Sequence, residues 1–216
     1  MTFLASHQLP LSGNEVNNMN EKEDSSFISP PQTQLSSLLE LYQSRRFSDA
    51  EKLSLEIIQD FPKHQFAWKV LGAVLGTTGR KSEAEAAYQT AVALSPQDAG
   101  AHNNLGNTLK ALGRLDEAEA SYNQAIALKP DFAEAHNNLG NTLKALGRLG
   151  EALASYNQAI ALKPDFAVAH NNLGSTLKVL GRLDEALASY NQAIALKPDY
   201  AVAHNNLGST LKVLGR

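Results

Sequence analysis

The sequence contains no cysteine and no large excess of charge of either sign. Without cysteine the chain can form neither a disulfide framework nor a thiolate metal site. Lysine and arginine number 19 against 22 aspartates and glutamates, a net charge of −3, which argues against bulk attraction to nucleic-acid phosphates. No apolar run approaches the roughly 18 residues of a membrane-spanning helix, and the first residues lack the basic start and apolar core of a signal peptide. We therefore expect a cytoplasmic protein whose partners include neither nucleic acid nor a membrane.

Catalytic signatures are missing as well. The sequence has no glycine-rich phosphate loop ending in Gly-Lys-Ser/Thr, no His-Glu-x-x-His and no Gly-x-Ser-x-Gly. We predict no catalytic residue, no cofactor and no metal site, so this chain by itself is not expected to be an enzyme.

A period of 34 residues dominates the sequence. Blocks 99–132 and 133–166 differ at three positions, and the latter differs from block 167–200 at five. Earlier copies drift further and the last stops half finished. The five and a half repeats are 31–64, 65–98, 99–132, 133–166, 167–200 and the partial copy 201–216. Residues 1–30 are rich in Ser, Asn, Glu and Pro and have no period, so we expect them to be disordered; Met19 is a candidate start within them.

Each repeat reads as two amphipathic helices, because its apolar residues recur at helical spacing. In the fourth repeat they are His136, Leu139, Gly140, Leu143 and Leu146, then Leu149, Ala152, Tyr156, Ala159 and Ile160. Gly147 is expected to end the first helix and Pro164 the second. One such hairpin cannot bury its own apolar faces, so neighbouring repeats must stack as a solenoid. We predict helices near 32–44, 48–60, 65–77, 82–94, 99–112, 116–128, 133–146, 150–162, 167–180, 184–196 and 201–214.

The spacing resembles the tetratricopeptide repeat, or TPR. The pattern W/H-x-x-L-G-x-x-L, followed by Ala, Tyr, Ala and Pro, covers residues 31–216. The resemblance implies an all-α fold: a right-handed superhelical solenoid of antiparallel helix pairs, whose first helices line a concave groove. The first repeat departs from the pattern, because Ser37 and Leu38 stand where Leu and Gly are expected. This departure leaves two registers open for its first helix, and its terminal place suggests a capping repeat.

Asparagines and lysines recur at positions 5, 6, 9 and 12 of the first helix, opposite its apolar stripe. Each asparagine costs roughly half a kcal/mol of helix propensity relative to alanine, yet its amide can donate to and accept from an extended peptide. We therefore predict a peptide-binding row: Asn103, Asn104, Asn107, Lys110, Asn137, Asn138, Asn141, Lys144, Asn171, Asn172, Lys178, Asn205 and Asn206. The alternative is that these side chains merely solvate an exposed face and were copied with the repeat.

The row is similar to the asparagine ladder in the TPR region of O-linked N-acetylglucosamine transferases. That resemblance implies that the asparagine before the position-7 leucine holds substrate backbone. Those residues are Asn104, Asn138, Asn172 and Asn206. In the fifth repeat, Lys178 lies inward and the acids Asp184 and Glu185 outward, which predicts a mildly basic groove.

Two other rows are interpreted as structural. Trp68 shares position 4 with His102, His136, His170 and His204. This position therefore favours a large planar side chain, and stacked helix pairs lie too far apart for two histidines to share a zinc ion at about 2 Å. The tyrosines at position 24 lie on the apolar face of the second helix and are expected in the core: Tyr88, Tyr122, Tyr156 and Tyr190.

A TPR-type carboxylate clamp, which grips chaperone tails, is not expected. Lys69 and Asn104 fit the clamp, whereas Ala73, Glu134 and Asn138 fall where it needs an asparagine, a lysine and an arginine.

Three functions remain open. The first is a protein- or peptide-binding scaffold that uses the concave groove. The second is the substrate-recruiting arm of a larger glycosyl-, sulfo- or methyltransferase, and the third is a structural spacer that self-assembles. The sixth repeat supplies a first helix without a second, so Leu207, Leu211 and Leu214 lack a hairpin partner. This uncapped helix predicts weak self-association.

Overall fold

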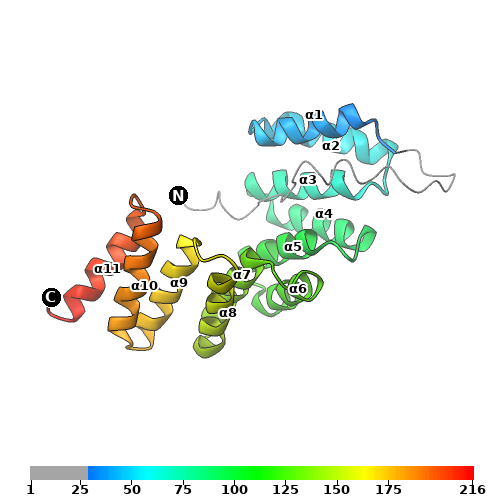
Figure 1. Cartoon of the computed structure of the whole chain (residues 1–216). Helices are drawn as coiled ribbons and strands as arrows, with labels where there is room; N and C mark the ends of the chain where they lie inside the picture. The colour runs from blue at the N-terminus through cyan, green and yellow to red at the C-terminus, as the bar shows by residue number, and fades with distance from the viewer. Residues whose placement is uncertain (1–28) are drawn as a thin grey trace. The chain divides into compact units, whose positions relative to one another are not determined.

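The computed structural model describes residues 29–216. Over these residues it contains eleven α-helices and no strand (Figure 1), which confirms the predicted all-α fold of stacked helix pairs. The helices are α1 Gln32–Gln43, α2 Phe47–Asp60, α3 Gln65–Thr77, α4 Lys81–Leu94, α5 Ala99–Ala111, α6 Leu115–Leu128, α7 Ala133–Ala145, α8 Leu149–Leu162, α9 Ala167–Val179, α10 Leu183–Leu196 and α11 Ala201–Val213. Predicted and observed bounds agree to within one residue. Of residues 1–30, for which disorder is expected, residues 1–28, with the candidate start Met19, lie outside the described residues.

Position 15 of the repeat sets the turn between its two helices. Gly147 has a φ of +78°, in the left-handed region that favours glycine. The N–H of Arg148 then donates to the carbonyl of Leu143 at 2.9 Å, which satisfies an end group of α7. The second helix begins directly at Leu149, one residue earlier than predicted, because the turn needs only Gly147 and Arg148 after the cap.

The chain divides into two compact units. Unit 1 ends at Arg114 and contains α1 to α5, and unit 2 runs from Leu115 to Arg216 and contains α6 to α11. The boundary therefore lies inside the third repeat, between its two helices.

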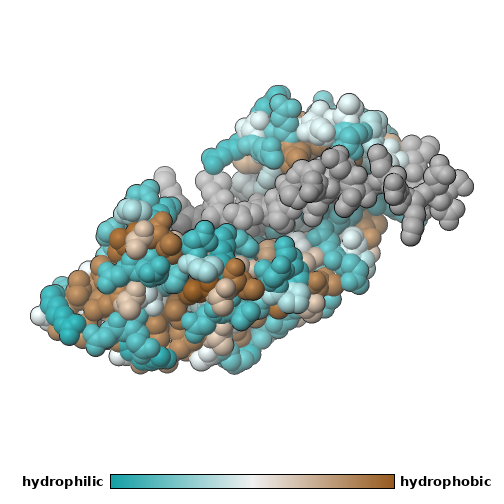
Figure 2. All heavy atoms as spheres, viewed as in Figure 1, coloured by the Kyte–Doolittle hydropathy of each residue, from teal (hydrophilic) through white to brown (hydrophobic). Residues whose placement is uncertain are grey.

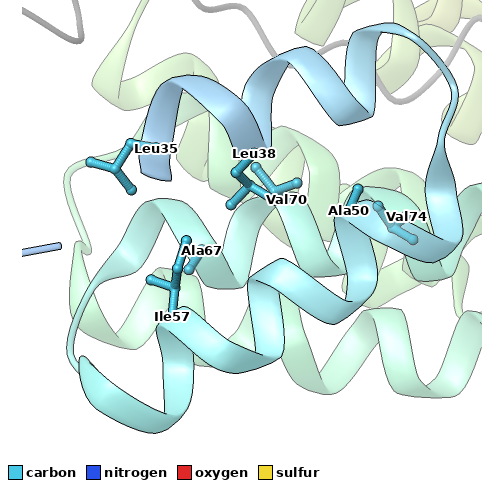
Figure 3. Packing of buried hydrophobic residues seen from close by; sticks show 7 residues of the cluster. All are labelled: Leu35, Leu38, Ala50, Ile57, Ala67, Val70 and Val74. Carbon is cyan, nitrogen blue, oxygen red and sulfur yellow. The ribbon is translucent and has the colours of Figure 1, made fainter. Parts of the chain in front are cut away.

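One core cluster of unit 1 lies where α1, α2 and α3 meet (Figure 3). Its buried side chains are Leu35, Leu38, Ala50, Ile57, Ala67, Val70 and Val74. Leu38 of the first repeat occupies position 8, which is glycine in the other repeats, and Ser54 occupies position 24, which is elsewhere tyrosine. Both are fully buried. The first repeat thus keeps the gap-free register, with the large and the small residue exchanged between its two helices.

In unit 2, glycine at position 8 brings the two helices of a repeat together. A Cβ atom on Gly140 would lie 2.7 Å from the Tyr156 ring, and one on Gly174 would lie 2.8 Å from the Tyr190 ring. Only glycine leaves room for the ring at this approach. Burial of Tyr156 and Tyr190 confirms their predicted place in the core, and Tyr88 and Tyr122 are buried as well.

Candidate functional site

The candidate residues lie on the first helices, where neighbouring repeats meet. In unit 2, α9 packs against both α7 and α11. Asn137 and Asn171, at position 5, each expose only 5% of their surface. The helical wheel placed position 5 opposite the apolar stripe of its own helix, which gave no sign of this burial. Position 5 points away from the helix's own hairpin partner, but the first helix of the next repeat covers it.

The buried asparagines join consecutive repeats in unit 2. The Nδ2 atom of Asn172 donates to Oδ1 of Asn137 at 3.0 Å, and Nδ2 of Asn206 donates to Oδ1 of Asn171 at 2.9 Å. A position-6 amide is thus held by the position-5 amide of the preceding repeat. We call this series, formed by Asn137, Asn171, Asn172 and Asn206, the amide ladder. Its members do more than solvate an exposed face.

A second series of bonds runs beside the amide ladder. The Nζ atom of Lys144 donates to Ser175 Oγ at 2.6 Å, and that of Lys178 donates to Ser209 Oγ at 2.7 Å. Burial lowers the pKa of Lys144. The side chain of Asn141, at position 9, accepts a 2.9 Å hydrogen bond from the hydroxyl of Tyr156.

The position-6 asparagines of unit 2 remain half-buried, so a ligand can reach them. These residues are Asn138, Asn172 and Asn206. Asn205, at position 5 of α11, is exposed, since no further first helix packs against α11 in the part of the chain that the structure describes.

In unit 1 the equivalent face is built differently, because Lys69 replaces asparagine at position 5. Lys69 is buried and its Nζ atom lies 2.7 Å from Asp98 Oδ2. Gln65 donates to the same oxygen at 2.6 Å, while Asp98 Oδ1 accepts from the backbone N–H of Ala101 and caps α5. Lys69 is therefore committed to an internal ion pair, which is a further argument against a carboxylate clamp.

With lysine at position 5, unit 1 lacks the asparagine pair that forms the amide ladder in unit 2. Asn104 is buried, and neither its Nδ2 nor its Oδ1 finds a hydrogen-bond partner within the described part of the chain. The acceptor that an asparagine at position 5 would offer is missing, because an ammonium group only donates. Asn103 and Asn107 beside it are buried too, and burial lowers the pKa of the half-buried Lys110. Sequence reasoning missed the roles of Gln65 and Asp98; the lysine at an asparagine position was the signal.

Each ring at position 4 makes one hydrogen bond, which explains why a ring with a polar nitrogen recurs there. Nε2 of His136 lies 3.0 Å from the carbonyl oxygen of Pro130, and Nε1 of Trp68 donates to the carbonyl of Pro62 at 2.9 Å. The same contact recurs at His102, His170 and His204. Each ring therefore ties a first helix to the proline that ends the preceding repeat. Over the described residues no group of three or more potential metal ligands comes together, and no helix there is long and apolar enough to cross a membrane.

These features define a helical-repeat protein in which each hairpin is bonded to the next. A family model for the TPR repeat matches residues 78–113, 106–147, 140–178 and 176–215, which together span more than half of the chain. The chain belongs to the TPR repeat family. No curated protein matches it.

Several solved structures are similar to this chain. TTC0263, a thermophilic TPR protein of Thermus thermophilus, is 27% identical over 84% of this chain and 98% of its own, with a TM-score of 0.69. YrrB, a TPR protein with an unusual peptide-binding site, is 22% identical over 80% and 89%, with a TM-score of 0.65. PilW, a type IV pilus biogenesis factor, is 22% identical over 85% of each chain, with a TM-score of 0.79. At such identities YrrB and PilW share the fold alone.

Proposed function

We propose that this protein is a cytoplasmic scaffold that holds an extended peptide segment of a partner protein along its first-helix faces. One observation carries the proposal: two half-buried amides of unit 2, Asn172 and Asn206, are fixed in orientation by the repeat before them. Fixed polar groups bind with less loss of conformational freedom than mobile ones. A scaffold role is also in keeping with membership of a repeat family and with the peptide-binding site of YrrB.

The bonding pattern suggests which atoms would meet the peptide. Asn172 and Asn206 use Nδ2 to reach the preceding repeat, so Oδ1 is the amide atom left for a ligand. An extended peptide presents backbone N–H groups that such oxygens accept. The neighbouring Lys144 and Lys178 would donate to peptide carbonyls, since an ammonium group has three donors and each uses one on a serine. The role of asparagine ladders in O-linked N-acetylglucosamine transferases is the analogy for this binding mode.

The experiment for this proposal is a random-peptide library displayed against the 216-residue chain, followed by fluorescence anisotropy with synthetic peptides. Replacing Asn138 and Asn172 by alanine should weaken binding by roughly 1–3 kcal/mol, because buried polar groups of the peptide lose their partners. The matched control replaces Asn157 and Asn191, exposed asparagines on the second helices, and should leave the affinity unchanged. Failure of every selected peptide to bind saturably would contradict the proposal.

Self-assembly is a second candidate, and α11 provides its supporting observation. A Cβ atom on Gly208 would meet nothing within 4 Å, whereas Gly140 and Gly174 face tyrosine rings of their own second helices. This open flank of α11 is a place where a helix of another copy could stack. The third candidate, an arm of a larger transferase, has no such structural feature in its favour.

A further inference from the structure

Exposed aliphatic side chains are concentrated on α9 and α11. Of the large hydrophobic residues that are exposed in the described part of the chain, only Leu55 lies in unit 1. The others are Val168, Val179, Leu180, Val202 and Val213. In Figure 2, hydrophobic surface shows between hydrophilic side chains over the helices that end the chain. Clustered exposed apolar side chains mark sites of interaction more often than isolated ones do.

Four of these residues form a regular set, which we call the valine face: Val168 and Val202 at position 2, and Val179 and Val213 at position 13. Positions 2, 6, 9 and 13 follow one another along a single side of a helix. Positions 6 and 9 are the ones that bond to neighbouring first helices through Asn172 and Ser175. The valines therefore flank the amide ladder, with exposures of 40%, 44%, 62% and 64% for Val168, Val202, Val179 and Val213.

The valine face is particular to the last two repeats. In the fourth repeat Glu134 and Ala145 stand at positions 2 and 13, and in the third Gly100 and Ala111. Valine in place of glutamate at position 2 also removes a negative charge. Glu134 Oε1 pairs with Lys163 Nζ at 3.0 Å in the fourth repeat. In the fifth repeat valine replaces this acid, and Lys197 retains the ring contact that Lys163 also makes: its Nζ lies 5.5 Å from the centre of the Tyr200 ring, against 5.0 Å between Lys163 and the Phe166 ring.

The charged residues on the two helices that carry the valine face are lysines, while one aspartate stands in the turn before each helix, Asp165 and Asp199. Helices α9 and α11 contain no aspartate or glutamate, and each carries a lysine at position 12, Lys178 and Lys212. Lys197, exposed at the end of the fifth repeat, adds a third ammonium group. Aliphatic surface bordered by ammonium groups complements a ligand that combines apolar side chains with carboxylates.

We propose that the valine face selects partner segments in which Leu, Ile or Val residues are interspersed with Asp or Glu. This inference rests on the proposed function and specifies which peptides the scaffold accepts. Neighbouring helices lie about 8–10 Å apart, and an extended chain advances about 3.3 Å per residue. Aliphatic anchors about three residues apart would therefore meet successive first helices, while the amide ladder holds the backbone between them.

The test uses the same displayed library and the full chain. Selected peptides should be enriched in aliphatic and acidic residues together, and their affinity should fall as salt rises. Changing Val168 and Val202 to glutamate, the residue that the fourth repeat has at this position, should weaken binding at least tenfold. Changing Val179 and Val213 to alanine, as in the third and fourth repeats, should weaken it several-fold. The control Leu55→Glu should have no effect, and thermal melts of all variants should match the parent.

The possible failures are distinct. If peptides bind and require Asn138 and Asn172 but are unaffected by the valine substitutions, or lack the aliphatic and acidic residues, this inference is overturned and the scaffold function stands. If no peptide binds at all, the scaffold function itself is wrong. If the valine substitutions abolish self-association in analytical ultracentrifugation and leave peptide binding intact, the valine face serves a second copy of the chain instead.

Discussion

At the scale of single residues, one hydrogen bond accounts for the aromatic rings at position 4 of the second to sixth repeats. A ring N–H must reach the carbonyl of the proline that ends the preceding repeat, and both histidine and tryptophan supply it. Planarity was visible in the sequence, because Trp68 and the histidines share a position. The acceptor of the hydrogen bond could not be predicted from the sequence, because the proline carbonyl comes within reach only when the hairpins stack.

Among the residues that form the turns between paired helices, Arg45 has the least favourable backbone conformation. It has a φ of +58°, the one positive φ outside glycine in the described residues, at the position where every later repeat has glycine. The left-handed conformation costs a residue with a Cβ atom about 1–2 kcal/mol in the folded state. A glycine would avoid this cost, but its greater backbone freedom in the unfolded state would cancel about 0.5–1 kcal/mol of the gain. We expect Arg45→Gly to stabilise the protein by roughly 0.5–1 kcal/mol in urea unfolding. The reverse change, Gly147→Arg, should destabilise it, and a loss of stability in Arg45→Gly would refute the argument.

Asp98 should make the stability of unit 1 sensitive to acid. Burial by itself would raise the pKa of this carboxyl, but Lys69, Gln65 and the N–H of Ala101 outweigh burial, and the pKa is lowered. A lowered pKa means that the stabilisation is present above the unfolded value, about 3.9, and is lost as the pH falls through the lower folded value. The melting temperature should therefore drop below about pH 4.

The variant Asp98→Asn separates the effect of the negative charge on stability from the effect of capping α5. Asparagine keeps a side-chain acceptor for the Ala101 N–H but leaves the Lys69 ammonium group buried without a counter-ion. The free energy of unfolding of the variant should therefore fall by about 3 kcal/mol at about pH 7. Its melting temperature should also change less than that of the parent when the pH is lowered from about 5 to about 3. Equal acid sensitivity in the two proteins would assign the effect to other carboxyls.

At the scale of helices, the sequence predicted almost every bound, because glycine, proline and the apolar spacing act locally. The register of α1 could not be read from Ser37 and Leu38, since it depends on the complementary change at Ser54, 16 residues later. The candidate site was predicted as a set of residues on one side of the first helix. Burial of Asn137 and Asn171 could not be predicted, because a helical wheel describes one helix and the covering side chains belong to the next repeat.

The amide ladder predicts that the same substitution has different effects at two positions. Asn171→Ala would leave the Nδ2 of Asn206 without its acceptor in a half-buried site, so we expect a loss of about 1–2 kcal/mol. Asn205 has the equivalent place in the next repeat but is exposed, so Asn205→Ala should be neutral or slightly stabilising, since alanine is the better helix former. Chemical denaturation of both variants checks this difference, and equal losses would show that the asparagine bond adds nothing.

At the scale of whole molecules, the open flank of α11 bears on self-association. Because Gly208 faces no tyrosine ring, Gly208→Asp should leave the melting temperature of the monomer unchanged while placing a charge where a helix of another copy would stack. Light scattering at high concentration should show weak association in the parent and none in the variant. Gly174→Asp, whose Cβ would meet the Tyr190 ring, is expected to be destabilised. A parent that stays monomeric would remove the basis for this prediction.

On the outer surface of unit 2, the connection between repeats changes along the chain. Arg148 pairs with Glu119 of the preceding repeat at 2.6 Å. One repeat later the acid is replaced by Leu153, which packs against the cluster of Leu177, Ala186 and Tyr190. Ion pairs weaken with salt and apolar contacts do not, so the joint between the fourth and fifth repeats should be less sensitive to ionic strength than the joint before it.

The ring-to-proline bonds and the amide ladder join only consecutive repeats. A hairpin at the end of unit 2 can consequently open without disturbing those further in, and each opening exposes the next. Amide protons should then exchange with deuterium in a gradient, fastest in α11 and slower through α9 and α10. A partner segment that binds several repeats at once would hold the terminal helices against the interior ones. Its binding should therefore slow amide exchange even in helices that it does not contact.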